Sequence, residues 1–250
     1  MNLQNAYIII IKKVSVRTKS FLMFLEYIFM SNRFKKAFVA FGGNVVSSVG
    51  EPKQTIIAAL KELESDSLEI SKLSNFYSTP AFPLGSGPDF VNAVAYIQTD
   101  TNAEELLKKF HKIESIFDRT RSYRWAPRPI DIDLLAFEDQ IYPSQYEFLK
   151  WSNLTITEQT KRVPSKLILP HPRIQDRVFV LVPFLDVSKN WVHPVFKKTL
   201  TQMLGALKPM DKEIIYQILE EVEVMAHKEL KRQHLLVEEM VQVPHQQRVY

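Results

Sequence analysis

Apolar and polar positions along the chain predict six elements between residues 36 and 136. Short apolar or alternating runs predict strands at 36–44, 68–79, 89–99 and 130–136. Apolar residues at helical spacing predict helices at 51–64 and 101–117, the second capped by Thr101 or Asn102. The order β-α-β-β-α-β is that of a ferredoxin-like α+β core, in which both helices cover one face of an antiparallel sheet.

The rest of the chain is expected to surround this core. Residues 81–88 hold two prolines and two glycines and predict a loop, while 143–165 are polar and aperiodic and predict an insertion or long loop. The apolar stretch 166–187 should pack onto the sheet, followed by additional C-terminal helices at 197–207 and 211–240. We therefore expect a domain at 36–207, an N-terminal extension at 1–35 and a helical extension with a tail at 208–250.

Composition narrows the class of protein. The 250 residues are 46% hydrophobic and 24% charged, as in ordinary soluble proteins, and the net charge of +4 permits an anionic ligand. The absence of cysteine excludes disulfides, thiolate catalysis and zinc–thiolate sites. Apolar runs are shorter than the roughly 18–20 residues that span a bilayer, so we expect no membrane association and a cytoplasmic location.

The first 36 residues differ from the rest, because they are basic and partly apolar and carry Glu26 as their single acid. This composition resembles an organelle transit peptide, which makes a mitochondrial location the alternative. The other interpretation is an upstream extension without function, with Met30 as the natural start. A secretory signal fits poorly, since the apolar runs are short or interrupted.

Two carboxylates stand out on the strand at 130–136. Asp131 and Asp133 are two residues apart, so their side chains share one face about 6–7 Å apart, while Ile130, Ile132 and Leu134 point the other way. Carboxylates this close repel unless a cation lies between them, and Mg²⁺ with substrate phosphates is the obvious candidate. The alternative is a solvated outer face of an ordinary strand.

Four arginines lie just before this strand, namely Arg119, Arg121, Arg124 and Arg128. Guanidinium groups bind phosphate oxygens in a bidentate way, and carboxylates for Mg²⁺ with arginines for phosphate are typical of phosphoryl transfer. The alternative is a basic surface patch.

Two single residues are further candidates. His171 is held between two prolines and either binds a phosphate or a base, or is an ordinary loop histidine. Asn92 either forms hydrogen bonds with a heterocyclic ligand or is a half-exposed strand residue.

Five motifs together resemble one family. FGGN (41–44), FYSTPAF (76–82), PDFVNAV (88–94), RWAPRPIDIDLL (124–135) and LPHPRIQDRVFVLVP (169–183) occur in this order. They resemble 6-hydroxymethyl-7,8-dihydropterin pyrophosphokinase of folate biosynthesis, over about residues 36–205. The resemblance implies transfer of diphosphate from ATP to the pterin hydroxymethyl group with release of AMP, and a possible functional link to dihydropteroate synthase.

The resemblance also implies roles for individual residues. Asp131 and Asp133 would hold two Mg²⁺ ions that bridge the ATP phosphates. Arg119 and Arg121 would be catalytic arginines on a mobile loop that closes over the triphosphate. Trp125 would be the tryptophan of that loop that seals the nucleotide site.

The remaining implied roles divide between the two substrates. On the ATP side they fall to Arg128, which is also catalytic, and to Lys166, His171 and Arg177. On the pterin side they fall to Gly42, Thr79, Pro80, Phe82, Asn92 and the sandwiching aromatics Phe90 and Phe179. Glu114 matches an acidic residue on the preceding helix.

This sequence departs from the family pattern at three positions, where it has Phe90, Pro129 and Lys166 in place of the more usual Tyr, Thr and Arg.

Two rival functions are weighed against the resemblance. An RNA-binding domain would need aromatics in an RNP1-type pattern, which is missing from the sequence. An inactive scaffold acting through the C-terminal helix would not need the paired carboxylates, and only an assay separates it from the enzyme.

Overall fold

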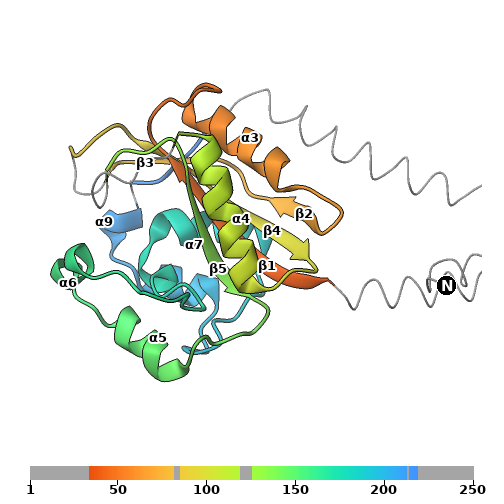
Figure 1. The fold of residues 1–250 in the computed structure, drawn as a ribbon. Coiled ribbons are helices and arrows are strands. Elements are labelled where there is room, and N and C mark those ends of the chain that lie inside the picture. The colour runs from red at the N-terminus through yellow and green to blue at the C-terminus, as the bar shows by residue number, and fades with distance from the viewer. Residues whose placement is uncertain (1–33, 82–84, 119–125, 213, 219–250) are drawn as a thin grey trace, which may run out of the picture. The chain divides into compact units, whose positions relative to one another are not determined.

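The computed structural model describes residues 34–81, 85–118, 126–212 and 214–218 (Figure 1). The described residues through Gln217 belong to one compact unit built on an antiparallel sheet. Its strands are β1 (Lys35–Gly43), β2 (Leu68–Leu73), β3 (Tyr77–Thr79), β4 (Phe90–Thr99), β5 (Asp131–Phe137) and β6 (Tyr216–Gln217). The order is β5-β1-β4-β3-β6, with β2 also paired to β4, so β1 and β4 are central.

Helices cover both faces of this sheet. The predicted pair, α3 (Pro52–Leu63) and α4 (Ala103–Ile116), packs together over β1 and β5 on one face, as the ferredoxin-like order requires (Figure 1). Asn102 caps α4 by accepting a hydrogen bond from the Glu105 N–H at 2.9 Å. On the other face lie α7 (Val178–Val187) against β4 and α8 (Leu200–Ala206) against α7, which confirms that the stretch 166–187 packs on the sheet.

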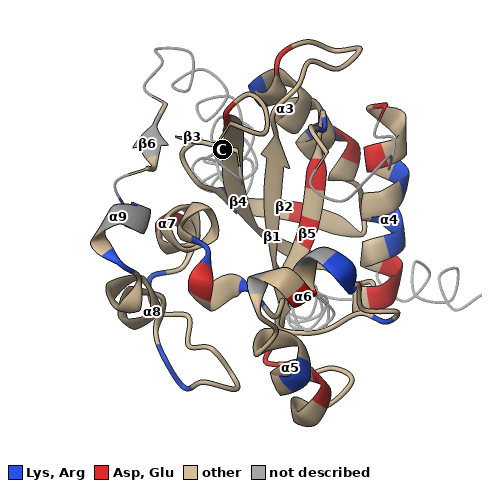
Figure 2. Cartoon of the chain, turned by 90° about the vertical axis from the view of Figure 1, so that its left-hand side faces the viewer, with Lys and Arg blue, Asp and Glu red and all other residues tan. Residues whose placement is uncertain are grey.

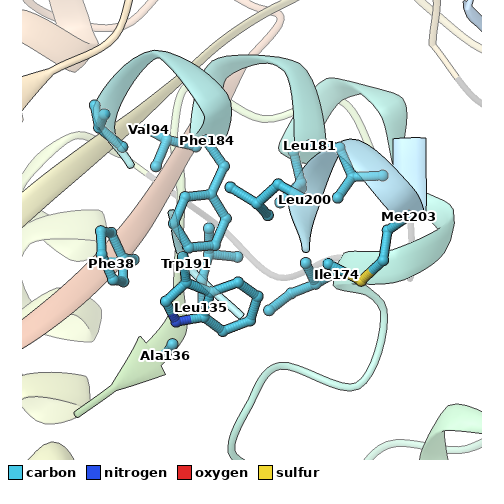
Figure 3. Close-up of a cluster of buried hydrophobic side chains, with 12 residues drawn as sticks. Phe38, Val94, Leu135, Ala136, Ile174, Leu181, Phe184, Trp191, Leu200 and Met203 are labelled. Carbon is cyan, nitrogen blue, oxygen red and sulfur yellow. The ribbon is translucent and has the colours of Figure 1, made fainter. Parts of the chain in front are cut away.

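The core on the α7 side joins the sheet to the C-terminal third of the domain. Phe38, Val94 and Leu135 come from three neighbouring strands and are at least 92% buried. They meet a cluster from the segment 174–203, whose labelled members in Figure 3 are Ile174, Leu181, Phe184, Trp191, Leu200 and Met203. This packing fixes α7, and with it the start of α7, relative to β5.

The strand predicted at 68–79 is divided into β2 and β3, which pair with successive parts of β4. Ser74 causes the break. Its N–H donates to the Val94 carbonyl at 2.9 Å, and its hydroxyl accepts from the Val94 N–H at 2.9 Å. A serine side chain here replaces one backbone partner of the ladder, which hydrophobic patterning does not reveal.

The long loop predicted at 143–165 instead contains α5 (Gln145–Ser152) and α6 (Ile156–Lys161). Ser144 and Thr155 cap these helices by accepting hydrogen bonds from the N–H groups of Glu147 and Glu158. The two S/T-x-x-E patterns were the available signal, and the helices are too short to show a clear apolar period.

The helix predicted at 211–240 is wrong at residues 216–217, which form a strand, although residues 211–212 are helical. A short α9 (Pro209–Lys212) is followed by β6, whose residues pair with Tyr77 and Ser78 of β3. The unpaired backbone of an edge strand offers the extended chain a partner that local helix propensity does not anticipate. Most of the predicted helix, 219–240, lies outside the described residues. Within the ranges given above, every helix is too short or too polar to cross a membrane.

Candidate active site

The two carboxylates of β5 lie on the α7 side of the sheet. In the ladder with β1, Asp133 pairs with Ala40 and Asp131 with Gly42, and Ala40 packs against the α7 cluster. The side chains of Asp131 and Asp133 are 21% and 40% exposed. Ile130, Ile132 and Leu134 are nearly fully buried on the other face. The predicted alternation is therefore confirmed, and the strand presents two acidic groups beside the start of α7.

Basic side chains from two distant segments surround these carboxylates. Arg128 precedes β5 and forms a 2.7 Å ion pair with Asp131. From the loop before α7, Arg177 Nη1 lies 3.7 Å and His171 Nε2 lies 3.9 Å from Asp133 Oδ2. Figure 2 shows the acidic part of β5 in red. The fold thus brings together five of the residues selected from the sequence, which are Arg128, Asp131, Asp133, His171 and Arg177.

His171 is held in one orientation and one protonation state. Its N–H donates to the Leu135 carbonyl at 2.7 Å, and its ring Nδ1 accepts from the Arg173 N–H at 3.1 Å. Removal from solvent, and then the nearby Arg177 guanidinium, lower the pKa of His171 well below its usual value of 6.5. The ring is therefore neutral near pH 7, and Nε2 carries the proton on the side of Asp133.

A second group of polar and aromatic residues lies around Asn92, which is separated from Asp131 by Gly42 of β1. Asn92 on β4 is 5% exposed, so it is buried and not half-exposed. Its amide donates to the Thr79 hydroxyl at 2.9 Å. A Cβ on Gly42 would lie 3.4 Å from the Asn92 Oδ1 and 3.8 Å from the Phe90 ring, so glycine at this position keeps a side chain from covering them.

Arg128 and Arg177 of the carboxylate site each contact an aromatic ring of this second group. The Arg128 guanidinium lies 5.2 Å from the Phe90 ring centroid, and the Arg177 guanidinium lies 5.6 Å from that of Phe179. Phe179, at the start of α7, is 36% exposed. An exposed aromatic ring beside a cation is able to stack with a flat ligand.

Asn44 is a site residue to which sequence reasoning assigned no role, although it ends the FGGN motif. It is 3% exposed and connects three segments. Its side chain donates to the Pro88 carbonyl at 3.1 Å and accepts from the Arg128 N–H at 2.8 Å, while its own N–H donates to the Arg128 carbonyl. Asn44 therefore fixes the approach of Arg128 to Asp131.

Glu114 has a supporting position beneath β5. This buried carboxylate accepts a hydrogen bond from the Ile132 N–H at 2.8 Å, between the two aspartates in sequence. The contact joins α4 to the acidic strand on the face opposite the α7 cluster. Glu114 is thus placed to hold the backbone of β5.

The remaining selected residues are not among the described contacts of this cluster. Arg119, Arg121, Trp125 and Phe82 lie outside the described residues. Lys166 is exposed, and no hydrogen bond or ion pair in the described part joins it to the carboxylates. Pro80 follows β3 and is half-buried next to Thr79.

A metal ion at this site would depend partly on ligands from a substrate. In the described part of the chain, His, Cys, Asp and Glu side chains do not form groups of three or more suited to a metal. Two carboxylates alone fit Mg²⁺, because this ion commonly takes one or two protein carboxylates and fills its other positions with phosphate oxygens and water. The donor set of Asp131 and Asp133 is therefore suited to a metal–nucleotide complex.

Comparison with known proteins agrees with this chemistry. The family model described as 7,8-dihydro-6-hydroxymethylpterin-pyrophosphokinase (HPPK) matches residues 38–189. A 2-amino-4-hydroxy-6-hydroxymethyldihydropteridine pyrophosphokinase of Aquifex aeolicus is 31% identical over 166 residues, covering 65% of this chain and 90% of that protein. The enzyme of the same name from Synechocystis is 31% identical over 168 residues, covering 67% and 74%.

Solved structures show the same fold. A Plasmodium falciparum HPPK-DHPS variant superposes with a TM-score of 0.52 at 15% identity, over 75% of this chain and 48% of that one. This chain thus spans about half the length of that solved protein. The family model covers most of the domain and both halves of the candidate site, and a relative at 31% identity is matched over nearly its whole length. The chain belongs to the 7,8-dihydro-6-hydroxymethylpterin-pyrophosphokinase (HPPK) family.

Proposed function

We propose that this chain transfers diphosphate from ATP to 6-hydroxymethyl-7,8-dihydropterin, giving the pterin diphosphate and AMP, as a step of folate biosynthesis. Membership of the HPPK family supports the reaction. The observation that carries the assignment to residues is the grouping of Asp131 and Asp133 with Arg128, His171 and Arg177, directly beside the buried Asn92 amide.

The pterin is proposed to lie between Phe90 and Phe179. A flat heterocycle stacks well between two rings, and a buried amide such as that of Asn92 can donate to and accept from its polar edge. The Asn92 amide donates to the Thr79 hydroxyl and, at 3.4 Å, to the Phe90 carbonyl, and the carbonyl partner identifies the nitrogen as the donor end. Gly42 places no side chain against this amide. We propose backbone contacts from Pro80 and Phe82 as well.

ATP is proposed to lie along the basic side of β5. Arg128 and Arg177 are suited to bind phosphate oxygens as bidentate donors, and neutral His171 can donate from Nε2. Lys166, Trp125 and the loop residues Arg119 and Arg121 complete the proposed nucleotide site. Closure of that loop over bound ATP would keep water from the β-phosphorus and so prevent hydrolysis of ATP.

Asp131 and Asp133 are proposed to hold two Mg²⁺ ions with the ATP phosphates. Such ions neutralise charge on the phosphates and align them with the attacking hydroxyl. In the structure Arg128 balances the charge of Asp131. Arg128 is therefore close enough to pass from the carboxylate to a phosphate oxygen when the nucleotide arrives.

The test is AMP formation from ATP and Mg²⁺ with and without 6-hydroxymethyl-7,8-dihydropterin. Pterin-dependent AMP is expected, whereas ADP would indicate an ordinary kinase and an absence of turnover in folded protein would support the scaffold alternative. Asp133→Ala is expected to lower turnover at least about 10³-fold, because positioning and charge neutralisation supply most of the catalysis. Its far-ultraviolet circular dichroism should match the wild type, since Asp133 is 40% exposed. Near-normal turnover in this variant would refute the metal assignment.

We further propose a cytoplasmic location and a functional link to dihydropteroate synthase, with mitochondria as the alternative location if residues 1–35 act as a transit peptide. Fluorescent fusions that begin at Met1 and at Met30 separate the two locations. Co-purification with dihydropteroate synthase from the source cells tests the link.

A further inference from the structure

The helical segment 143–165 is anchored to the domain at several points, although its sequence resembles a loop. Tyr142 and Leu169 exchange two backbone hydrogen bonds of 2.9 Å, which tie the start of the segment to the chain just before His171. Phe148 of α5 is fully buried and contacts the rings of His193 and Phe196 at centroid distances of 5.3 and 5.4 Å. The position of α5 is therefore fixed relative to the loop that carries His171.

Arg173 makes the contact between that loop and the C-terminal end of α5. Its guanidinium donates from Nη1 to the Ser152 carbonyl at 2.9 Å and to the Leu154 carbonyl at 3.3 Å. The last carbonyls of a helix lack partners within the helix and carry partial negative charge. Arg173 is only 16% exposed, and it donates to the carbonyl of Ser152, the last residue of α5, and to that of Leu154 just beyond the helix, which makes a directional, charge-assisted connection.

Arg173 also spans the short turn between His171 and Arg177, the two groups proposed to bind ATP. Residues Ile174–Asp176 form a 3₁₀ turn, with His171 and Arg177 on either side of it. Across this turn Arg173 forms an ion pair with Asp176, and its N–H donates to the His171 ring at 3.1 Å. Arg173 thus contacts both ends of the segment that presents His171 and Arg177 to Asp133.

We propose that Arg173 is a positioning residue for the nucleotide, which braces the His171–Arg177 turn against α5 and so makes segment 143–165 part of the ATP site. This inference rests on the proposed function, because it takes His171 and Arg177 as the groups that bind ATP. Arg173 itself points to α5 and Asp176, so it supports ATP binding through its neighbours. On the pterin side, Asn92 is held by Thr79, and Phe179 belongs to α7, which is held by its own packing on β4, so the pterin contacts depend less on this brace than the ATP contacts do.

The experiment compares Arg173→Met, Arg173→Lys and a control, Arg162→Gln, with the wild type. Methionine keeps the length and much of the apolar contact of arginine but removes all donors, whereas lysine keeps the charge with a single donor group. Arg162 lies on the same segment, is 44% exposed and contacts Glu158 and Trp151. For each protein the KM for ATP, the KM for pterin, kcat and the melting temperature are measured.

Arg173→Met is expected to raise the KM for ATP about tenfold, which corresponds to about 1.4 kcal/mol. The KM for pterin should stay within twofold, Arg173→Lys should lie between the wild type and Arg173→Met, and Arg162→Gln should match the wild type. Direct titration with a non-hydrolysable ATP analogue should show the same order of affinities.

Two results would overturn the inference. The first is an unchanged KM for ATP in folded Arg173→Met, or in Arg173→Lys if the methionine variant does not fold. The second is a parallel rise of both KM values with a lower melting temperature, since that is the result of a general structural role. Failure of the proposed function is distinct, because the wild type itself would then form no AMP with pterin.

Discussion

The surroundings of His193 predict how the free energy of unfolding depends on pH. It is fully buried, and Nδ1 accepts hydrogen bonds from the N–H groups of Val195 and Phe196, both at 3.2 Å. Its ring neighbours are Phe148, Trp191 and Phe196. Burial among these rings lowers the pKa of His193 from 6.5 to about 4.

The direction and size of the effect follow from proton linkage. Because the folded pKa lies below the unfolded one, the unfolded chain binds the extra proton between pH 6.5 and 4, and the contribution to stability is lost as the pH falls through this window. A full shift of about 2.5 pKa units is worth about 3.4 kcal/mol. At pH 5, where the unfolded histidine is almost fully charged, the loss is about 2 kcal/mol.

Urea unfolding of the wild type and His193→Asn at pH 8, 6 and 5 measures this loss. The Oδ1 of asparagine can replace Nδ1 as the acceptor, so the variant keeps the turn but does not titrate. Other titrating groups, including His171, contribute equally to both proteins and cancel in the difference. The wild-type advantage in the free energy of unfolding should fall by about 2 kcal/mol between pH 8 and pH 5. A difference that stays constant within about 0.5 kcal/mol would refute the reasoning.

Three further predictions test the fold and the proposed pterin site. Gly43→Ala should lower the free energy of unfolding by about 1–3 kcal/mol, because its Cβ would lie 2.3 Å from the Pro129 carbonyl oxygen. Gly205→Ala, a helical position with open space around the new Cβ, is the matched control and should be neutral or gain about 0.5–1 kcal/mol in urea unfolding. Asn102→Ala should cost about 1 kcal/mol by removing the α4 cap, and an unchanged melting curve would contradict that role. Phe179→Ala should raise the KM for pterin about tenfold while Phe179→Tyr retains stacking, and equal KM values in both variants would exclude the sandwich.

The sequence predicted the central fold well where periodicity decides the structure. The strands at β1, β4 and β5 and the helices α3 and α4 each have a clear apolar pattern, and each forms within a few residues of its expected limits. Prediction failed where a single polar contact or a distant partner decides. Ser74 divides one strand, two serine and threonine caps create α5 and α6, and the edge of β3 draws residues 216–217 into the sheet.

The candidate site shows the same division. Alternation on β5 was enough to place Asp131 and Asp133 on one face, and the family motifs drew attention to His171 and Arg177. The role of Asn44 could not be predicted, because it depends on loops that lie 44 and 84 residues away in sequence. Hydrogen bonds over such separations leave no local pattern in the sequence.

The sheet order has a consequence for how the protein acquires its activity during synthesis. β1 leaves the ribosome before the other described strands, whereas its neighbours β4 and β5 end only at Thr99 and Phe137. Until those strands emerge, β1 exposes two unpaired edges and an apolar surface, which is the condition under which nascent chains associate wrongly. The carboxylates of β5 and the loop of His171 emerge after β1 and β4, so the proposed nucleotide site is completed only once the strands on both sides of β1 are available.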